Sequence, residues 1–553
     1  MHLFRLTTCL ALSLAFAAWA PTAEAANKPV DAPQRAASAP DDETKAPIAA
    51  DERLQPRQRE TTGSVQVGGQ RIDYRAVAGL MVIDDSKDEP SATMSYVAYF
   101  KRASGATGAS ATPRPVTFLY NGGPGSATLW LHLGAFGPQR VLTANGQRGP
   151  SAPYKWVDNE FSLLDVSDLV FIDAPGTALG RIVAVDKDKE KEREKLKEKE
   201  KEFFGVDQDA RAFAQFIHKF LTQHQLWNAP KYLFGESYGT TRSAVLAARL
   251  QREENIDLNG VILLSQILNF NFSVDEAQFN PGIDLPYALA LPTYAATAWY
   301  HRRLPAFPKD SAALEPLLAE VRRFALGDYL QALQAGSQLD ADKRRQVIDT
   351  LARYTGLKPA YLDKADLRIN GGMFTQNLLE DQGQVVGRFD TRYTGPALDR
   401  LSKEADYDAQ SAAIGPAYVA AYNHYLRTTL KFGQDMVYKP GIDIWRHWDW
   451  HHQPPGVEMP LSQTVNVMPD LAAAMKVNPR LKVQMHAGYF DLATTFFAAE
   501  FELDQLPLPA ALRSNIEIQH YPAGHMMYDD PASLRTLHDE VAKFIRATDN
   551  LPR

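Results

Sequence analysis

The chain has 553 residues and a net charge of −7 at pH 7. A chain of this length can bury a large core and form more than one domain. Its acidic balance lacks the basic footprint of a nucleic-acid-binding protein, so we expect no nucleic-acid partner. The single cysteine, Cys9, lies near the N-terminus, and the chain beyond it cannot form a disulfide.

The first 25 residues have the pattern of a secretory signal peptide. An apolar stretch covers residues 10–20, and an A-x-A cleavage pattern follows at 23–25. The stretch is too short to span a membrane, and no other stretch reaches the roughly 18 apolar residues that a span needs. Cys9 precedes the apolar region, which argues against a lipoprotein. We therefore predict an exported protein, periplasmic or secreted, without a membrane span.

The rest of the chain predicts strands and helices in alternation. Residues 26–62 are rich in Ala, Pro, Asp, Arg and Gln and indicate a disordered linker. Residues 64–79 alternate around a Gly-Gly turn, as in a β-hairpin. Later strands are expected at 93–102, 115–125, 169–176, 231–237, 260–266, 481–491 and 516–525, and helices at 210–224, after residue 237, and at 533–546. This alternation predicts an α/β fold with a mostly parallel central sheet and helices on both faces.

Two segments interrupt the alternation. Residues 272–465 are aromatic and largely helical in pattern, and we interpret them as a large inserted cap between two parts of the core, 63–271 and 466–553. In residues 186–202 the charges alternate in sign apart from Leu196. A helix would place opposite charges at i,i+3 and like charges at i,i+4, so the two effects nearly cancel. We interpret this run as a solvated, frayed helix or a disordered loop and not as a docking site.

The main chemical signal is the sequence G-E-S-Y-G around Ser237, a G-x-S-x-G between a predicted strand and a predicted helix. A strained turn at this point would raise the serine hydroxyl above the sheet. A serine nucleophile needs a base, and the base needs an acid to hold it. Asp491 and His525 each follow a predicted strand, in the chain order Ser, Asp, His of such sheets. We predict that these three residues meet at one edge of the sheet.

Other acids and histidines fit this arrangement less well. His486 and His520 lie within predicted strands, and His132 precedes the serine in the chain. Asp529 and Asp530 follow His525 too closely to hold its ring from behind.

Acyl transfer also needs hydrogen-bond donors for the developing oxyanion. The backbone N–H of Tyr238, directly after the serine, would be one donor. The sequence N-G-G-P-G at 121–125 follows an earlier strand and would supply the second donor, which we assign to Gly123.

Four motifs occur in a fixed order: N-G-G-P-G-S at 121–126, G-E-S-Y-G at 235–239, the turn that holds Asp491, and A-G-H-M at 523–526. Together with F-I-D-A-P-G-T at 171–177, they resemble the serine carboxypeptidase family of the α/β-hydrolase fold. The similarity covers about residues 65–272 and 465–550.

The resemblance implies the same catalytic and oxyanion residues that the chemistry indicates. It further implies that Asn121 and Glu236 hold the C-terminal carboxylate of a peptide and that Met526 lines the leaving-group pocket. An ionised Glu236 would repel that carboxylate, whereas a protonated one could donate a hydrogen bond to it. Burial should raise the pKa of Glu236 and so couple binding to acid pH. The alternative is a glutamate that only supports the turn.

Residues 445–452 contain three tryptophans and three histidines, but their spacing fits no ordinary zinc pattern. We interpret them as aromatic packing or as a wall of the substrate pocket, and we expect no metal and no cofactor.

We therefore predict a capped α/β-hydrolase that removes C-terminal residues from peptides through an acyl-enzyme, best at acid pH. The alternatives are an esterase or acyltransferase with the same triad and, less favoured, a catalytically inactive binding protein. The sequence does not determine the oligomeric state.

Overall fold

The computed structural model describes residues 50–102, 114–275, 277–307, 310, 313–461 and 463–551. Contacts divide the chain into two units, Met1–Ile48 and Ala49–Arg553. The predicted signal peptide lies outside the described residues, as does the predicted linker up to residue 49. The predicted cap belongs to the same compact unit as the rest of the fold, and its boundaries stay a prediction.

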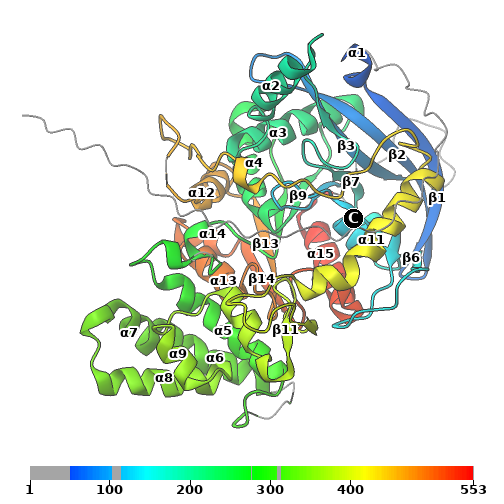
Figure 1. Ribbon diagram of the computed structural model, residues 1–553. Helices are drawn as coiled ribbons and strands as arrows, with labels where there is room; N and C mark the ends of the chain where they lie inside the picture. Colours follow the sequence, from blue (N-terminus) through cyan, green and yellow to red (C-terminus); the bar gives the residue numbers. More distant parts are fainter. Residues whose placement is uncertain are drawn as a thin grey trace, which may run out of the picture. The chain divides into compact units, whose positions relative to one another are not determined.

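A ten-stranded sheet forms the centre of the second unit (Figure 1). Its main path runs in the order β1-β2-β3-β7-β4-β9-β10-β13-β14, and β8 (Arg181–Ile182) pairs with β3. From β7 to β14 all neighbours are parallel, whereas the pairs β1–β2, β2–β3 and β3–β7 are antiparallel. The strands are β1 (Arg57–Val67), β2 (Gln70–Asp84), β3 (Pro90–Lys101), β4 (Val116–Tyr120), β7 (Asp168–Ile172), β9 (Lys231–Glu236), β10 (Gly260–Leu264), β13 (Lys482–Gly488) and β14 (Ile516–Tyr521).

The N-terminal hairpin confirms one prediction and corrects another. β1 and β2 pair from Arg57↔Leu80 to Val67↔Gln70 around the predicted Gly-Gly turn. The linker end at residue 62 is wrong, because β1 already begins at Arg57. Residues 57–62 have no apolar alternation, and they form an edge strand because β2 offers a long partner backbone. A charged edge strand of this kind also discourages pairing with other chains.

Each central strand serves two cores, because successive side chains point to opposite faces. On β9, Leu233 packs into one core, while Tyr232 and Phe234 pack into the other. The first core includes residues of α3 (Val206–Gln223), α4 (Tyr238–Glu253) and α12 (Met468–Val477). The second includes residues of α15 (Pro531–Thr548). The predicted sheet with helices on both faces, and with it the α/β-hydrolase fold, is confirmed.

The region predicted as a cap is mainly helical but not purely so. Its helices include α5 (Leu285–Tyr300), α6 (Leu314–Phe324), α7 (Leu330–Ala335), α8 (Ala341–Thr355), α9 (Pro359–Lys364), α10 (Gly371–Asn377) and α11 (Ala409–Thr428). Helices α6 to α9 gather together in Figure 1, whereas α11 lies apart from them and packs against β5 (Gln139–Val141). A short hairpin of β11 (Gln384–Val386) and β12 (Thr394–Pro396) joins α10 to α11. None of the described helices has the length and apolarity to cross a membrane.

The run of alternating charges forms helix α2 (Lys189–Glu200), which has no buried residue. This agrees with the solvated-helix interpretation and not with the disordered loop. Near the end of the helix, Lys199 donates hydrogen bonds to the buried carboxylate of Asp85 and to Ser91 Oγ. Lys199 also lies 3.7 Å from the carboxylate of Glu89, so the run has two ionic contacts, both through Lys199, to the loop between β2 and β3.

Candidate active site

The predicted strand–turn–helix around Ser237 is confirmed, since β9 ends at Glu236 and α4 begins at Tyr238. Ser237 has φ 60° and ψ −132°, a positive φ that costs energy for a residue with a side chain. A Cβ on Gly235 would stand 2.2 Å from the carbonyl oxygen of Gly239. Position 235, two residues before the serine, therefore needs glycine because the backbone folds back on itself.

Asp491 and His525 lie next to each other after the parallel strands β13 and β14. His525 Nδ1 lies 2.7 Å from Asp491 Oδ2, so the ring N–H donates to the carboxylate. Asp491 is fully buried, and it also accepts hydrogen bonds from the N–H of Ala493 at 2.9 Å and from the N–H and hydroxyl of Thr494 at 3.0 and 2.7 Å. Three donors besides the histidine therefore hold this carboxylate in place.

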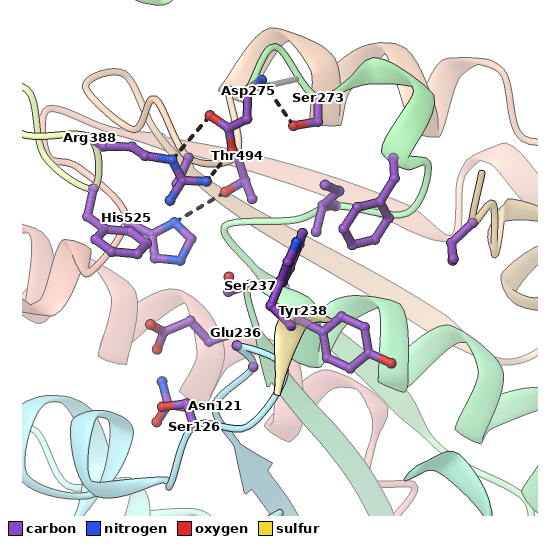
Figure 2. A pocket seen from close by; sticks show the side chains of 18 of the residues that line it. Asn121, Ser126, Glu236, Ser237, Tyr238, Ser273, Asp275, Arg388, Thr494 and His525 are labelled. Atoms are coloured by element: carbon purple, nitrogen blue, oxygen red, sulfur yellow. Dashed lines mark hydrogen bonds and ion pairs between the residues drawn. The ribbon is translucent and has the colours of Figure 1, made fainter. Parts of the chain in front are cut away.

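No described residue bonds His525 Nε2, and the His525 side chain lines the cavity. Burial opposes the charged imidazole, but the Asp491 carboxylate outweighs burial and raises the pKa of His525 above its usual value. Ser237 and His525 line one cavity of about 980 Å³. In Figure 2 the side chains of Ser237, His525 and Glu236 converge on the same part of this cavity. Such a geometry lets a histidine take a proton from a serine once substrate closes the distance.

The glycine loop lies directly against the start of α4. Tyr238 is the first residue of that helix, so its N–H has no intrahelical acceptor and carries the positive end of the helix dipole. A Cβ on Gly122 would stand 2.4 Å from Tyr238 N, and Gly123 has φ 106°. The absent side chain of Gly122 allows the close approach, a requirement that sequence reasoning did not assign. The positive φ of Gly123 sets the direction of the backbone at the predicted second donor.

Buried ionic contacts hold this loop in place. The carbonyl oxygen of Asn121 accepts a hydrogen bond of 2.8 Å from Arg242, whose guanidinium is fully buried and paired with Asp209 at 2.5 Å. Asn121 N donates to Thr128 Oγ1 at 3.3 Å, and Thr128 N donates to Asp173 at 2.8 Å. Among the residues that hold the loop, only Asp173 lay in a motif of the sequence analysis, F-I-D-A-P-G-T at 171–177. The Arg242–Asp209 pair joins α4 to α3, and no local pattern announces it.

Glu236 is buried beside Asn121. Tyr528 donates a hydrogen bond of 2.9 Å to Glu236 Oε2, and the side chain of Asn121 also contacts the carboxyl. Asn121 Oδ1 accepts from Leu131 N at 3.1 Å, which leaves the amide NH₂ to face Glu236. Burial raises the pKa of Glu236 to about 7. The predicted direction of this shift is confirmed, whereas Tyr528 was not predicted from the sequence.

Aromatic side chains and Met526 form much of the cavity wall. The rings of Trp445 and Trp450 lie 4.6 Å apart, and Trp450 lies 5.2 Å from Phe270. The interpretation of residues 445–452 as a pocket wall is confirmed for Trp445 and Trp450. Among the described residues, no group of three or more His, Cys, Asp or Glu side chains could hold a metal ion.

The other histidines and acids considered from the sequence have structural partners. His132 is buried, stacks on Phe171 at 4.3 Å, and has its pKa lowered to about 3 by burial. His486 is likewise buried within β13, and His520 stacks on Tyr489. Asp530 caps α15, and Asp529 accepts hydrogen bonds from Thr143 and Tyr393. None of these side chains lines the cavity of Ser237.

A serine on a strained turn above a parallel sheet, with a histidine–carboxylate pair at the same edge, defines a serine hydrolase of the α/β-hydrolase fold. Residues 70–281 match the family model of the serine carboxypeptidases. The matched stretch includes the glycine loop and the Ser237 turn, and it ends before Asp491 and His525. The resemblance drawn from the motifs is confirmed over these residues: this part of the chain is similar to the serine carboxypeptidases, and the chain is a serine hydrolase.

More distant likenesses include three solved structures. The prohormone-processing carboxypeptidase Kex1Δp of Saccharomyces cerevisiae is 14% identical, with a TM-score of 0.48 and coverage of 89% of this chain and 92% of that chain. A peroxisomal alpha-beta-hydrolase of the same yeast is 8% identical (TM-score 0.31, coverage 90% and 93%). A thermostable carboxyl esterase of Bacillus coagulans is 11% identical (TM-score 0.31, coverage 89% and 99%). No curated protein matches the chain.

Proposed function

We propose that the protein is an exported serine carboxypeptidase that removes single residues from the C-terminus of peptides. Ser237 would be the nucleophile, His525 the general base and Asp491 the acid that orients it. The observation that carries the proposal is the buried pair of Asn121 and Glu236 beside Ser237, because it offers donors to a substrate carboxylate one residue from the attacked bond.

In the first half of the reaction, Ser237 Oγ attacks the carbonyl carbon of the last peptide bond while His525 Nε2 takes the hydroxyl proton. The N–H groups of Gly123 and Tyr238 receive the oxyanion. His525 then gives the proton to the leaving nitrogen, the C–N bond breaks, and the C-terminal amino acid departs. Water attacks the acyl-enzyme with the same base and frees the shortened peptide and the serine.

The carboxylate-binding pair would also set the pH dependence. Below its pKa of about 7, Glu236 is protonated and can donate a hydrogen bond to the substrate carboxylate. Above that pH it ionises and repels the carboxylate, so binding weakens. His525 sets the opposite limit, because it must be neutral to accept the serine proton and its pKa is raised. These two limits leave little overlap on the acid side unless bound peptide or the acyl-enzyme keeps His525 neutral there. On that condition we expect the maximum of kcat/KM on the acid side of neutral, where Glu236 is protonated.

Export is part of the proposal and depends on the signal-peptide pattern of residues 1–25. N-terminal sequencing of the mature protein tests it. A mature chain that starts after the A-x-A at 23–25 supports export, and an intact N-terminus in the cytoplasm contradicts it.

Mass spectrometry of a peptide pool after incubation at pH 5 and pH 7 tests the main proposal. Loss of single C-terminal residues supports a carboxypeptidase, while hydrolysis of esters with all peptides intact supports the esterase alternative. Peptides with an amidated C-terminus provide the matched control. One hydrogen bond to a charged group is worth about 1.5–3 kcal/mol, so amidation should lower kcat/KM roughly 10- to 100-fold. Equal cleavage of free and amidated peptides would refute the carboxylate-binding role.

A further inference from the structure

A short segment of the cap lies between the loops that hold the proposed acid and base. The carbonyl oxygen of Phe389 accepts a hydrogen bond of 2.7 Å from His525 N, and that of Arg388 accepts one of 3.1 Å from Leu492 N. The neighbouring Gly524 packs so closely that a Cβ there would lie 2.4 Å from Asp390. This cap segment is thus part of the site and not a removable cover.

The side chains of the segment pack in sequence against His525, the proposed base. The Phe389 ring lies 5.0 Å from the His525 ring, and the Arg388 guanidinium lies 5.1 Å from the centre of the Phe389 ring. Arg388 also pairs with Asp275 through two of its guanidinium nitrogens: Nε donates to Oδ1 at 3.2 Å, and Nη2 donates to Oδ2. Figure 2 shows this ion pair beside His525, where both partners line the cavity.

The charges around His525 act in opposite directions. The carboxyl groups of Asp491 and Glu236 raise the pKa of His525, and the positive charge of Arg388 lowers it. Two further acids stand behind the arginine: Asp275, in the ion pair, and Asp408, which accepts the N–H groups of residues 388 and 389.

We propose that Arg388 is a positioning residue of the hydrolytic site. Anchored by Asp275, it fixes Phe389 against His525 and holds a positive charge beside the Asp491–His525 pair. The inference depends on the proposed role of His525 as the base, and on no particular substrate.

The sign of the effect follows from the chemistry. His525 accepts the Ser237 proton only when it is neutral, so activity falls on the acid side as His525 becomes protonated. Removing the Arg388 charge would leave Asp275 unbalanced, favour the imidazolium, and move the acid limb of the pH profile to higher pH. Removing the Asp275 charge would leave Arg388 unbalanced and move the same limb to lower pH.

The test measures the pH profile of kcat/KM from pH 4 to 8 for four variants: Arg388→Gln, Asp275→Asn, the double variant and Arg388→Lys. Because the ion pair is partly exposed, we expect moderate shifts. At a pH on the acid limb, Arg388→Gln should lose about three-fold in kcat/KM relative to its own plateau, and Asp275→Asn should gain about as much. The double variant should return to the wild-type limb, and Arg388→Lys should retain it.

Each profile is recorded with an activated ester as well as a peptide. The ester reports the serine–histidine chemistry even if the carboxypeptidase proposal is wrong. Failure of that proposal is therefore distinguishable from failure of the inference about Arg388. Stoichiometric labelling by a serine-directed phosphonate confirms that each variant has a folded site. Limbs that stay in place, or that move in the same direction in both single variants, would overturn the inference, because a purely structural ion pair has no reason to shift them oppositely.

Discussion

Two buried histidine–carboxylate clusters among the described residues look alike and differ in one respect. At the proposed active site, His525 bonds one carboxylate through Nδ1 at 2.7 Å. In the other cluster, His452 bonds two carboxylates: Nδ1 lies 2.6 Å from Asp207, and Nε2 lies 2.8 Å from Asp470. No described residue bonds the second ring nitrogen of His525, which lines a cavity, whereas both ring nitrogens of His452 are occupied.

The second cluster joins three parts of the fold. Asp207 is in the first turn of α3, Asp470 is in α12, and His452 lies two residues after Trp450 in the region predicted as a cap. Burial opposes a charge on His452, but the hydrogen bonds to Asp207 and Asp470 outweigh it and raise its pKa to about 9. An imidazolium between two carboxylates is a cross-link. Burial and a carboxylate partner therefore do not identify a catalytic histidine; an unoccupied nitrogen at a cavity does.

The largest difference between the clusters should appear in activity. We expect Ser237→Ala and His525→Ala each to lower kcat by at least about 10⁴-fold, because a triad works as a unit. His452→Ala is the matched control and should keep kcat within a few-fold. Steady-state kinetics on one peptide compares them, and near-normal turnover in His525→Ala would contradict the assignment of the base.

The free energy of unfolding should show the reverse order: His452→Ala should lose more stability than His525→Ala. His452 is the only hydrogen-bond donor to the buried Asp470 carboxylate among the described residues. His452→Ala leaves that charge unpaired and should reduce the free energy of unfolding by about 3–5 kcal/mol. Asp491 keeps three other donors in His525→Ala, so that variant should lose much less. Urea unfolding at pH 6 measures the free energy of unfolding of both variants. Equal losses would contradict the proposed difference between a cross-linking and a catalytic histidine.

The same cluster should make wild-type stability depend on pH. The folded pKa of His452 is raised from about 6.5 to about 9, so its contribution is complete below pH 6.5 and is lost as the pH rises through 9. Unfolding measured from pH 6 to 10 should show this loss in the wild type and a smaller slope in His452→Ala.

Glu236 lies beside His525, and burial raises its pKa to about 7. In Glu236→Gln an amide can donate to the substrate carboxylate without ionising. The alkaline fall of kcat/KM should therefore flatten, and about one pH unit above 7 the variant should exceed the wild type by up to about ten-fold relative to their values at pH 6. The effect should appear mainly in KM. A variant that retains the wild-type alkaline limb would show that Glu236 only supports the turn.

The smallest effect should come from the ion pair of α2. Asp85 is as buried as Asp470, but besides Lys199 it accepts hydrogen bonds from Ser91 Oγ at 3.0 Å and from the N–H groups of Lys87 and Glu89 at 2.9 and 3.1 Å. Lys199→Ala should therefore cost about 1 kcal/mol or less. If Lys199→Ala lost as much free energy of unfolding as His452→Ala, the number of hydrogen-bond donors that remain on the buried carboxylate would not determine the loss of stability.

The sequence alone determined the features that are encoded within a few residues. The strand–turn–helix around Ser237 needs a glycine at 235 because of local backbone contact, and that requirement is visible as a motif. Apolar strands between helices determined the sheet, since the parallel strands are buried on both faces. Placement of Asp491 and His525 at one edge followed from the same rule, because parallel strands end on the same side.

Only the tertiary structure decided which distant residues support these features. The packing of Arg388 and Phe389 against His525 joins positions more than 130 residues apart, and Tyr528 and Arg242 reach the site from separate helices or turns. The edge strand at residues 57–62 formed against its own composition because a partner strand was present. Contacts of this kind depend on which surfaces meet after the chain folds. A single arginine, tyrosine or histidine leaves no periodic trace in the sequence that would reveal its partner.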